Sequence, residues 1–345
     1  MSISWINHNK YVVIENDSSN VRYKLASGSP VISIKKYKQL NGRYKYKVER
    51  VGDGSIIKIF DRTPFPENKK DVICPHFVEL KWANGCNFNC AWCYLNGTFR
   101  FRPMGKCPYL KDKKKILEHT NAFIDGVKIP TILNSGELAD SLVFEGNGFS
   151  FSSNVVPLFK KQTKHKLLFL TKSININGIL NSGSKKQTIA SFTVNAFNVS
   201  ERWERGSPNP MQRISAASKL SDEGYETRLR IDPLVPIKNW KERYIELIDY
   251  IFNNFTPERI TLGSLRGLQS TINNSKDTSW VKYLDENSNW GKKISIQKRY
   301  NMYKAIIDYL EKEYKYSNLG LCKETKEMWD MIGKDYRKIK CNCIN

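Results

Sequence analysis

The chain has 345 residues, of which 40% are hydrophobic and 26% are charged. It is long enough for one large domain or two ordinary ones, and it lacks an apolar run of the roughly 18 residues that a membrane helix needs. The formal net charge of +22 predicts an attraction to nucleic acid, although a composition rich in Lys, Asn and Ile also arises in AT-biased genomes without selection for binding.

The first residues, MSISWINHNKYVVIEN, lack the positively charged and then apolar pattern of a signal peptide. We therefore expect a cytoplasmic location and no membrane partner. In that setting the eight cysteines are metal ligands or free thiols rather than a disulfide framework.

Residues 1–70 predict a small antiparallel β module. Short runs rich in β-branched and aromatic residues are separated by Gly, Asn, Asp and Ser: KYVVIEN, SPVISIKKY, YKYKVERV and SIIKIFD. The stretch RTPFPENKKD, with two prolines and several charges, is typical of a linker. The module is a candidate platform for nucleic acid or for another partner.

From Val78 the pattern changes to strands that alternate with helices. Six strands are expected: Val78–Ala83, Thr131–Asn134, Lys166–Thr171, Ile189–Asn195, Thr227–Ile231 and Arg259–Gly263. Amphipathic helices are expected at 210–224, 240–255 and about 295–314. Such β–α units predict an α/β fold, a partial (β/α)6 TIM-like barrel over residues 71–267; an open doubly wound sheet is the alternative. In a parallel barrel, the chemistry gathers at the carboxyl ends of the strands.

Three cysteines follow the first of these strands, in the stretch GCNFNCAWCYL. Cys86, Cys90 and Cys93 have the spacing Cys-x3-Cys-x2-Cys, so one loop can wrap three thiolates around one face of a 4Fe-4S cluster. The fourth iron then keeps an open position for a substrate or cofactor. The alternative is a zinc knuckle with a fourth ligand from elsewhere, for instance His76, Cys74 or Cys107.

The cysteine spacing, with an aromatic residue before the last cysteine, resembles the signature of radical S-adenosylmethionine enzymes. In order along the chain, VELKWANGCNFNCAWCYLNGTFR, NSGELADSL, LLFLTKS, SFTVNA, PMQRISAASKLSDEGYETRLRIDPLVP and ITLGSLR resemble the spore photoproduct lyase branch of that superfamily. The resemblance implies a 4Fe-4S cluster and S-adenosylmethionine as cofactors. It also implies a 5′-deoxyadenosyl radical and an electron donor such as flavodoxin or ferredoxin.

The resemblance also implies which residues contact the cofactor. Ser135, Gly136 and Glu137 match an element that binds the methionine amino group, and Lys172 matches a lysine that pairs with its carboxylate. Further expected contacts come from Trp92, Ser173, Thr193, Asn195, Arg230 and Asp232. Local pattern alone leaves other roles open: helix caps in the NSGE turn, loop-tying side chains at Thr193 and Asn195, and a mutual salt bridge between Arg230 and Asp232.

Spore photoproduct lyases reverse a thymine–thymine photoproduct in DNA. The resemblance implies that a cysteine near the second strand returns a hydrogen atom and that tyrosines beside the last cluster cysteine relay it. Here NSGELADSL has no cysteine and Trp92 replaces one tyrosine, whereas Tyr94 is kept. We therefore expect Tyr94 to be catalytic, Arg266 to face substrate or phosphate, and Cys107 to be a possible replacement thiol.

These observations predict a radical S-adenosylmethionine enzyme that acts on nucleic acid, either DNA or RNA, by photoproduct repair or base modification. The same chemistry on a small molecule or peptide is the first alternative. A non-enzymatic nucleic-acid-binding protein with a structural metal site is the second.

Residues 268–345 form the last predicted region. The polar segment 268–294 carries two tryptophans and is expected to be a substrate lid, a base-stacking surface or a plain surface excursion. Cys322, Cys341 and Cys343 in the tail could bind a second metal or cluster, form a reducible thiol pair that supplies hydrogen atoms, or fill space as small buried residues.

Overall fold

The computed structural model describes residues 11–17, 19–25, 28–146 and 148–344, and it contains one large curved sheet. The parallel part of this sheet has the strands β7 (Phe77–Leu80), β11 (Ile132–Asn134), β12 (Lys166–Thr171), β13 (Thr188–Val194), β15 (Glu226–Leu234), β16 (Ile260–Ser264) and β20 (Leu319–Leu321), hydrogen-bonded in that order. A doubly wound sheet reverses its strand order partway, so this sequential order is that of a barrel.

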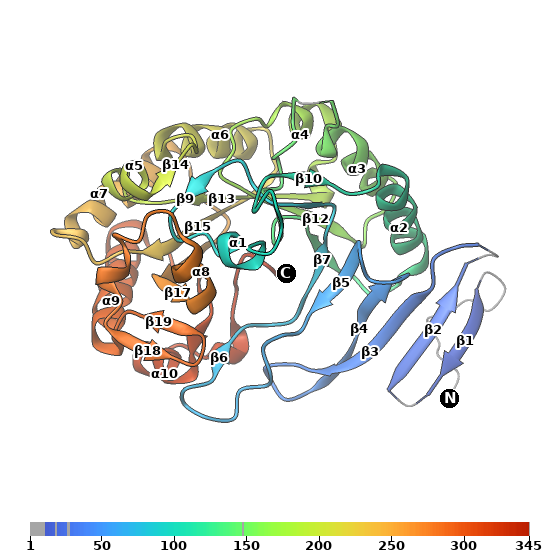
Figure 1. Ribbon diagram of the computed structural model, residues 1–345, viewed down its shortest axis with the longest axis horizontal. Coiled ribbons are helices and arrows are strands. Elements are labelled where there is room, and N and C mark those ends of the chain that lie inside the picture. Colours follow the sequence, from blue (N-terminus) through green and yellow to red (C-terminus); the bar gives the residue numbers. More distant parts are fainter. Residues whose placement is uncertain (1–10, 18, 26–27, 147, 345) are drawn as a thin grey trace.

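The parallel core confirms the α/β fold expected from the sequence. All seven residues of β13 are buried, as expected for a strand covered on both faces. Helices lie along the outer side of the arc of strands (Figure 1). The strand β20 extends the parallel sheet beyond the six predicted strands and pairs with β16.

The N-terminal strands form the antiparallel end of the same sheet. They are β1 (Val12–Asn16), β2 (Asn20–Lys24), β3 (Ile32–Lys38), β4 (Tyr44–Val51) and β5 (Ile57–Phe60). The strand β5 pairs antiparallel with β7, where Ile57 lies opposite Leu80. The expected antiparallel strands are therefore present and continue directly into the parallel part, while the division of the chain into domains stays a prediction. The two edges of the sheet are β1 and β20, so the barrel is open.

The helices are α1 (Leu95–Thr98), α2 (Lys113–Gly126), α3 (Phe151–Lys160), α4 (Asn177–Ser182), α5 (Phe197–Trp203), α6 (Pro210–Asp222), α7 (Trp240–Asn254), α8 (Gln269–Asn274), α9 (Ile296–Tyr314) and α10 (Lys326–Ile332). The predicted helices correspond to α6, α7 and α9. Helix α6 begins with a capping box, in which Asn209 accepts from the Gln212 backbone and the Gln212 side chain accepts in return.

Short strand pairs complete the fold. They are β8 (Ala83–Asn84) with β10 (Tyr109–Leu110), β9 (Asn89–Cys90) with β14 (Glu204–Arg205), β6 (Val72–Ile73) with β21 (Glu324–Thr325), and β17 (Arg266–Leu268) with β19 (Gly291–Lys293) and β18 (Glu286–Ser288). None of the helices in the described ranges is both long and apolar enough to cross a bilayer.

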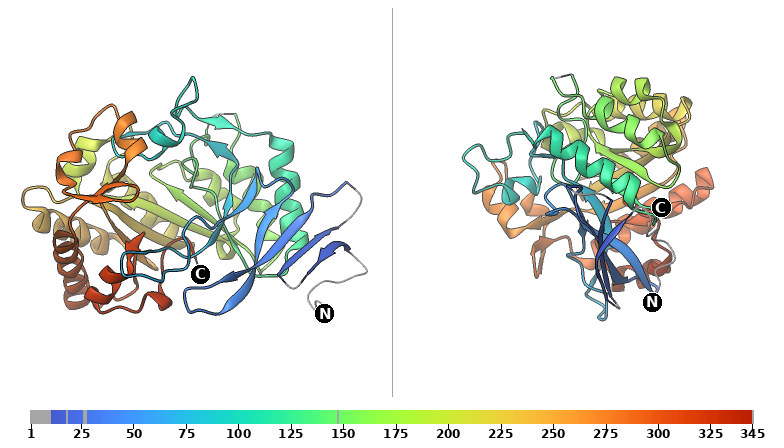
Figure 2. Two further views of the ribbon diagram at one scale, coloured as in Figure 1. Left: turned by 60° about the horizontal axis from the view of Figure 1, so that its bottom comes forward. Right: turned by 90° about the vertical axis from the view of Figure 1, so that its right-hand side faces the viewer.

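The C-terminal tail returns to the concave side of the sheet. Figures 1 and 2 both place the last described residues of the tail beside the parallel strands. The tail passes close to β20, where the Lys340 carbonyl and Cys341 backbone occupy the space that a side chain at Gly320 would need.

Candidate functional site

The three spaced cysteines lie on one loop at the carboxyl end of β7. Cys86 is held through its backbone N–H, which donates to the Lys106 carbonyl at 2.8 Å. Cys90 lies on β9, opposite Glu204 on β14. All three thiols are free, and Cys90 is buried whereas the other two are partly exposed. The loop is therefore fixed at several points while its thiols stay available as ligands.

Gly85 allows the backbone to turn after β8 into the cysteine loop. Its φ of +91° lies in the left-handed region, and a side chain there would collide with the Lys106 carbonyl and lie 2.6 Å from the Cys107 oxygen. We predict that Gly85→Ala destabilises the fold by about 1–3 kcal/mol, because it combines backbone strain with this collision. Chemical denaturation and the iron content after reconstitution would measure the effect.

Gly105 provides a matched control for this prediction. It also has a positive φ, of +51°, but no atom lies within 4 Å of the side-chain position. Gly105→Ala should therefore carry the backbone strain without the collision. Equal losses of stability and of iron in the two variants would show that the close approach at Gly85 has no role.

A buried ion pair lies next to the cysteine loop. Arg213 on α6 donates to Glu204 at 2.6 Å, and both side chains have 0% exposure. The Lys172 ammonium lies 3.6 Å from the same carboxylate. Burial alone would lower the pKa of Lys172, but Glu204 and the neighbouring Cys90 raise it to about 12. A fixed positive charge thus lies beside the cysteine loop at the end of β12.

The NSGE turn follows β11. Ser135 is buried and its hydroxyl donates to the Leu168 carbonyl at 2.9 Å. A side chain at Gly136 would meet Leu170, whose carbonyl would lie 2.8 Å away, so the glycine permits close packing against β12. The Glu137 carboxylate accepts from the Asn134 amide at 3.1 Å. Glu137 is the charged residue among those predicted in this turn, and its carboxylate forms no ion pair within the described part of the chain.

The polar residues at the end of β13 divide into different environments. Thr193 is nearly buried, and its carbonyl accepts from Arg213. The Asn195 amide is fully buried, donates to the Pro233 carbonyl and accepts from the Tyr244 hydroxyl, each at 2.9 Å. Its hydrogen bonds therefore tie β13 to β15, which is the loop-tying role that the sequence left open.

On β15, Arg230 and Asp232 have separate partners. Asp232 forms an ion pair with Arg266 at 3.1 Å, and the same guanidinium lies 3.6 Å from the Cys322 sulfur. Arg230 instead donates to the Cys343 sulfur at 3.1 Å. The mutual Arg230–Asp232 salt bridge considered from the sequence is therefore replaced by these two contacts.

The remaining predicted residues lie around the cysteine loop. Tyr94 follows Cys93 and is 39% exposed. Trp92 packs against Trp203, with ring centroids 5.8 Å apart. Ser173 follows Lys172, and its hydroxyl accepts from the Asn175 backbone at 3.1 Å.

The segment 268–294 packs onto the cysteine loop. The Ser275 hydroxyl donates to the Ala91 carbonyl at 2.6 Å, and Gly97 on α1 lies directly against Ser270 on α8. Trp280 is fully buried and is not available to a base-stacking surface, whereas Trp290 is exposed. The segment therefore supports the loop that carries the three thiols.

The sequence analysis missed two charged residues of this site, Arg213 and Glu79. Arg213 occupies a buried position of the amphipathic helix 210–222, and this charge on an apolar face was the signal that could have identified it. Glu79 on β7 is the second residue. Burial and the nearby Glu137 raise its pKa to about 7. Its neighbour on β11 is Asn134, so it belongs to the same side of the barrel as the NSGE turn.

Two comparisons place these features in a family. The sequence model of the family described as spore photoproduct lyase matches residues 78–331. Among curated relatives, the spore photoproduct lyase of Clostridium acetobutylicum is 26% identical over 174 residues, which is 49% of this chain and 50% of that protein. The enzyme of the same name from Geobacillus sp. is 23% identical over 245 residues, 70% of this chain and 65% of that protein. The chain thus spans about half the length of the first curated relatives that it matches.

The fold is also similar to that of a solved structure with the same family name. A solved structure described as spore photoproduct lyase complexed with dinucleoside spore photoproduct aligns with a TM-score of 0.60 at 15% identity, covering 71% of this chain and 75% of that chain. Since the family match spans more than half of the sequence and includes the three-cysteine loop, the chain belongs to the spore photoproduct lyase family of the radical S-adenosylmethionine superfamily.

Proposed function

We propose that this protein is a radical S-adenosylmethionine enzyme that acts on a nucleic acid. The observation that carries the proposal is the loop with three free thiols at the carboxyl end of β7, in a chain of this family. Cys86, Cys90 and Cys93 would hold a 4Fe-4S cluster and leave one iron for the cofactor.

The donor set fits such a cluster better than a single ion. Across the described parts of the chain, no three His, Cys, Asp or Glu side chains converge closely enough to hold one metal ion. The thiolates that hold a 4Fe-4S cluster bind different iron atoms, so they need not converge on a single point. Of the zinc alternatives, His76 contacts the Thr63 carbonyl at 3.0 Å, and Cys107 is exposed.

The residues around the loop fit S-adenosylmethionine. When bound, the cluster and this cofactor supply a 5′-deoxyadenosyl radical that abstracts a hydrogen atom from substrate. Glu137 would accept from the methionine ammonium, and Lys172 would attract the carboxylate. Arg230 and Asp232 would line the barrel interior beyond these groups. A protein such as flavodoxin or ferredoxin would deliver the electron.

Nucleic acid is the favoured substrate class for two reasons. The net charge of +22 attracts polyanions. In addition, a related protein was solved with a dinucleoside spore photoproduct. We therefore propose photoproduct repair or base modification, and Arg266 as a residue that faces the substrate. A small molecule or peptide as substrate is the alternative class.

The first experiment tests the radical chemistry. Protein reconstituted with iron and sulfide under anaerobic conditions and reduced with dithionite should cleave S-adenosylmethionine to methionine and 5′-deoxyadenosine. A reconstituted protein that carries its cluster and binds the cofactor, yet forms no 5′-deoxyadenosine, would contradict the proposal.

The second experiment separates the substrate classes, and we predict binding to DNA that weakens steeply with salt. Each phosphate contact releases counterions, so the logarithm of the affinity should fall with that of the salt concentration by about 0.9 per neutralised phosphate on duplex DNA. Fluorescence anisotropy between about 50 and 200 mM salt would measure this slope. Heparin, a polyanion without bases, serves as the control. Equal affinity for heparin and DNA would indicate that the protein binds through charge attraction alone. Negligible affinity for DNA and RNA would favour the small-molecule or peptide alternative.

A further inference from the structure

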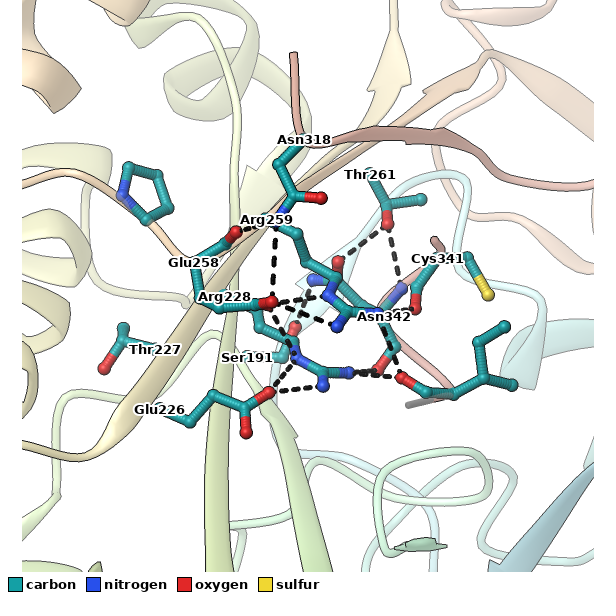
Figure 3. A network of polar contacts seen from close by, with 12 residues as sticks. Ser191, Glu226, Thr227, Arg228, Glu258, Arg259, Thr261, Asn318, Cys341 and Asn342 are labelled. Carbon is teal, nitrogen blue, oxygen red and sulfur yellow. Dashed lines mark hydrogen bonds and ion pairs between the residues drawn. The ribbon is translucent and has the colours of Figure 1, made fainter. Parts of the chain in front are cut away.

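The C-terminal tail is anchored inside the parallel barrel by the side chain of Asn342. This amide is fully buried, donates to the Ser191 hydroxyl at 2.7 Å and accepts from the Thr261 hydroxyl at 2.7 Å (Figure 3). It also donates to the Leu229 carbonyl at 2.8 Å. These partners come from β13, β15 and β16. The tail is therefore held at a defined depth rather than lying on the surface.

Two buried arginines hold the tail backbone. Arg228 donates to the carbonyls of Asn342 and Ile344, each at 2.8 Å, and Arg259 donates to the Ile344 carbonyl at 3.1 Å. Both guanidinium groups are balanced by carboxylates, including an ion pair of 2.6 Å between Arg259 and Glu258 (Figure 3). Buried charged donors make strong hydrogen bonds, so this clamp fixes the residue between Asn342 and Ile344.

That residue, Cys343, places its thiol across the interior of the barrel. Its sulfur accepts from Arg230 on β15 at 3.1 Å and lies 3.8 Å from the amide nitrogen of Asn134 on β11. The strands β12 and β13 separate β11 from β15 in the sheet, so a thiol that contacts both lies on the concave side. Glu137, the proposed cofactor contact, accepts from the same Asn134 amide group.

We propose that Cys343 is the thiol that donates a hydrogen atom to a carbon radical formed in this barrel. The inference rests on the proposed function. In the step, the S–H bond breaks homolytically and a C–H bond forms, leaving a thiyl radical on Cys343 without any change of charge. A hydrogen atom from 5′-deoxyadenosine, the product of cofactor cleavage, restores the thiol and regenerates the 5′-deoxyadenosyl radical.

The position of the other cysteines supports this assignment. Cys107, the replacement considered from the sequence, is exposed on the loop after Cys93. Cys322 is also partly exposed, but its sulfur lies 3.6 Å from Arg266 on β17, which is not a strand of the parallel sheet. Cys341 is buried beside Cys343 and hydrogen-bonds to it. Cys343 therefore combines partial exposure with contacts to two residues of the barrel interior.

The first test needs no substrate. Thiol hydrogens exchange with solvent, so reduced, reconstituted protein that cleaves S-adenosylmethionine in D2O should form 5′-deoxyadenosine that carries deuterium at C5′. Cys343→Ala should lose most of this deuterium while still forming 5′-deoxyadenosine, and Cys343→Ser provides a conservative second variant. Cys107→Ser is the matched control and should keep the label.

The outcomes separate the two proposals. Unchanged deuterium content in Cys343→Ala and Cys343→Ser would overturn the assignment of Cys343 and leave the proposed function intact. Wild-type protein that forms no 5′-deoxyadenosine would overturn the proposed function, and this inference with it.

A second test measures the thiol directly, without turnover. The charged and titratable groups that face Cys343 are Cys341, Arg230, Glu137 and Cys74. A hydrogen bond from Cys341 and the charge of Arg230 lower the pKa of Cys343, although burial and Glu137 oppose them. Its alkylation by iodoacetamide, followed by mass spectrometry, should therefore have a midpoint below the value of about 8.5 that is typical of an ordinary thiol.

The same alkylation assay tests the location of the thiol. S-Adenosylmethionine added to the reconstituted protein should slow the alkylation of Cys343 and leave that of Cys107 unchanged. Equal rates with and without the cofactor would contradict a position of Cys343 in the reaction chamber.

Discussion

Cys90→Ala is expected to abolish both cluster assembly and cleavage of S-adenosylmethionine. Cys90 is the buried thiol of the three, and it lies on the short strand β9 that pairs with β14. With two thiolates left on the loop, a 4Fe-4S cluster loses one of its protein ligands and the iron becomes labile. The oxygen-sensitive visible absorbance after reconstitution, the iron and sulfide content, and the yield of 5′-deoxyadenosine would measure the loss.

Cys107→Ser is the matched control for this prediction, because it also removes one thiol from the region but changes an exposed residue. Far-ultraviolet circular dichroism should show that the Cys90 variant keeps its secondary structure. Full iron content and activity in Cys90→Ala would exclude this residue as a ligand and favour a cluster held by other cysteines.

Arg213→Met is expected to destabilise the protein by about 3–5 kcal/mol, because it leaves the carboxylate of Glu204 buried and without its closest partner. Arg213 also donates to the Thr193 carbonyl at 2.9 Å and to the Ser200 hydroxyl at 3.0 Å, so these acceptors lose their hydrogen bonds as well. Equilibrium unfolding in urea would give the change in free energy.

The double variant Arg213→Met with Glu204→Gln provides the control. Removing both charges eliminates the unpaired carboxylate, so the double variant should be more stable than Arg213→Met alone. Additive losses would contradict a direct coupling between the two side chains. A loss in Arg213→Met below about 1 kcal/mol would show that water or Lys172 compensates for the missing guanidinium.

The ion pair between Arg213 and Glu204 also adjoins the candidate site, since Glu204 lies on β14 opposite Cys90 and within 3.6 Å of Lys172. A weakened pair would therefore disturb the cysteine loop and the proposed carboxylate contact together. A lower iron content in Arg213→Met than in a surface variant of equal stability would distinguish this local effect from general destabilisation.

Much of the barrel follows from local sequence patterns. The strand Lys166–Thr171 was predicted with its observed bounds, and helix α6 begins and ends within two residues of its prediction, because Pro210 and Gly224 mark its limits. In contrast, β20 was missed. Its three residues, Leu-Gly-Leu, are too few to show a period, and its pairing with β16 depends on the whole intervening chain.

The sequence alone determined the chemistry that three thiols can support, because Cys86, Cys90 and Cys93 lie within eight residues and one loop must bring them together. Only the tertiary structure decided which distant groups join them. Glu204 reaches Cys90 through the pairing of β14 with β9, and Cys343 reaches Arg230 across 113 residues of sequence. Spacing along the chain fixes contacts within a loop, whereas contacts between remote residues depend on how the sheet curls and how the tail enters it.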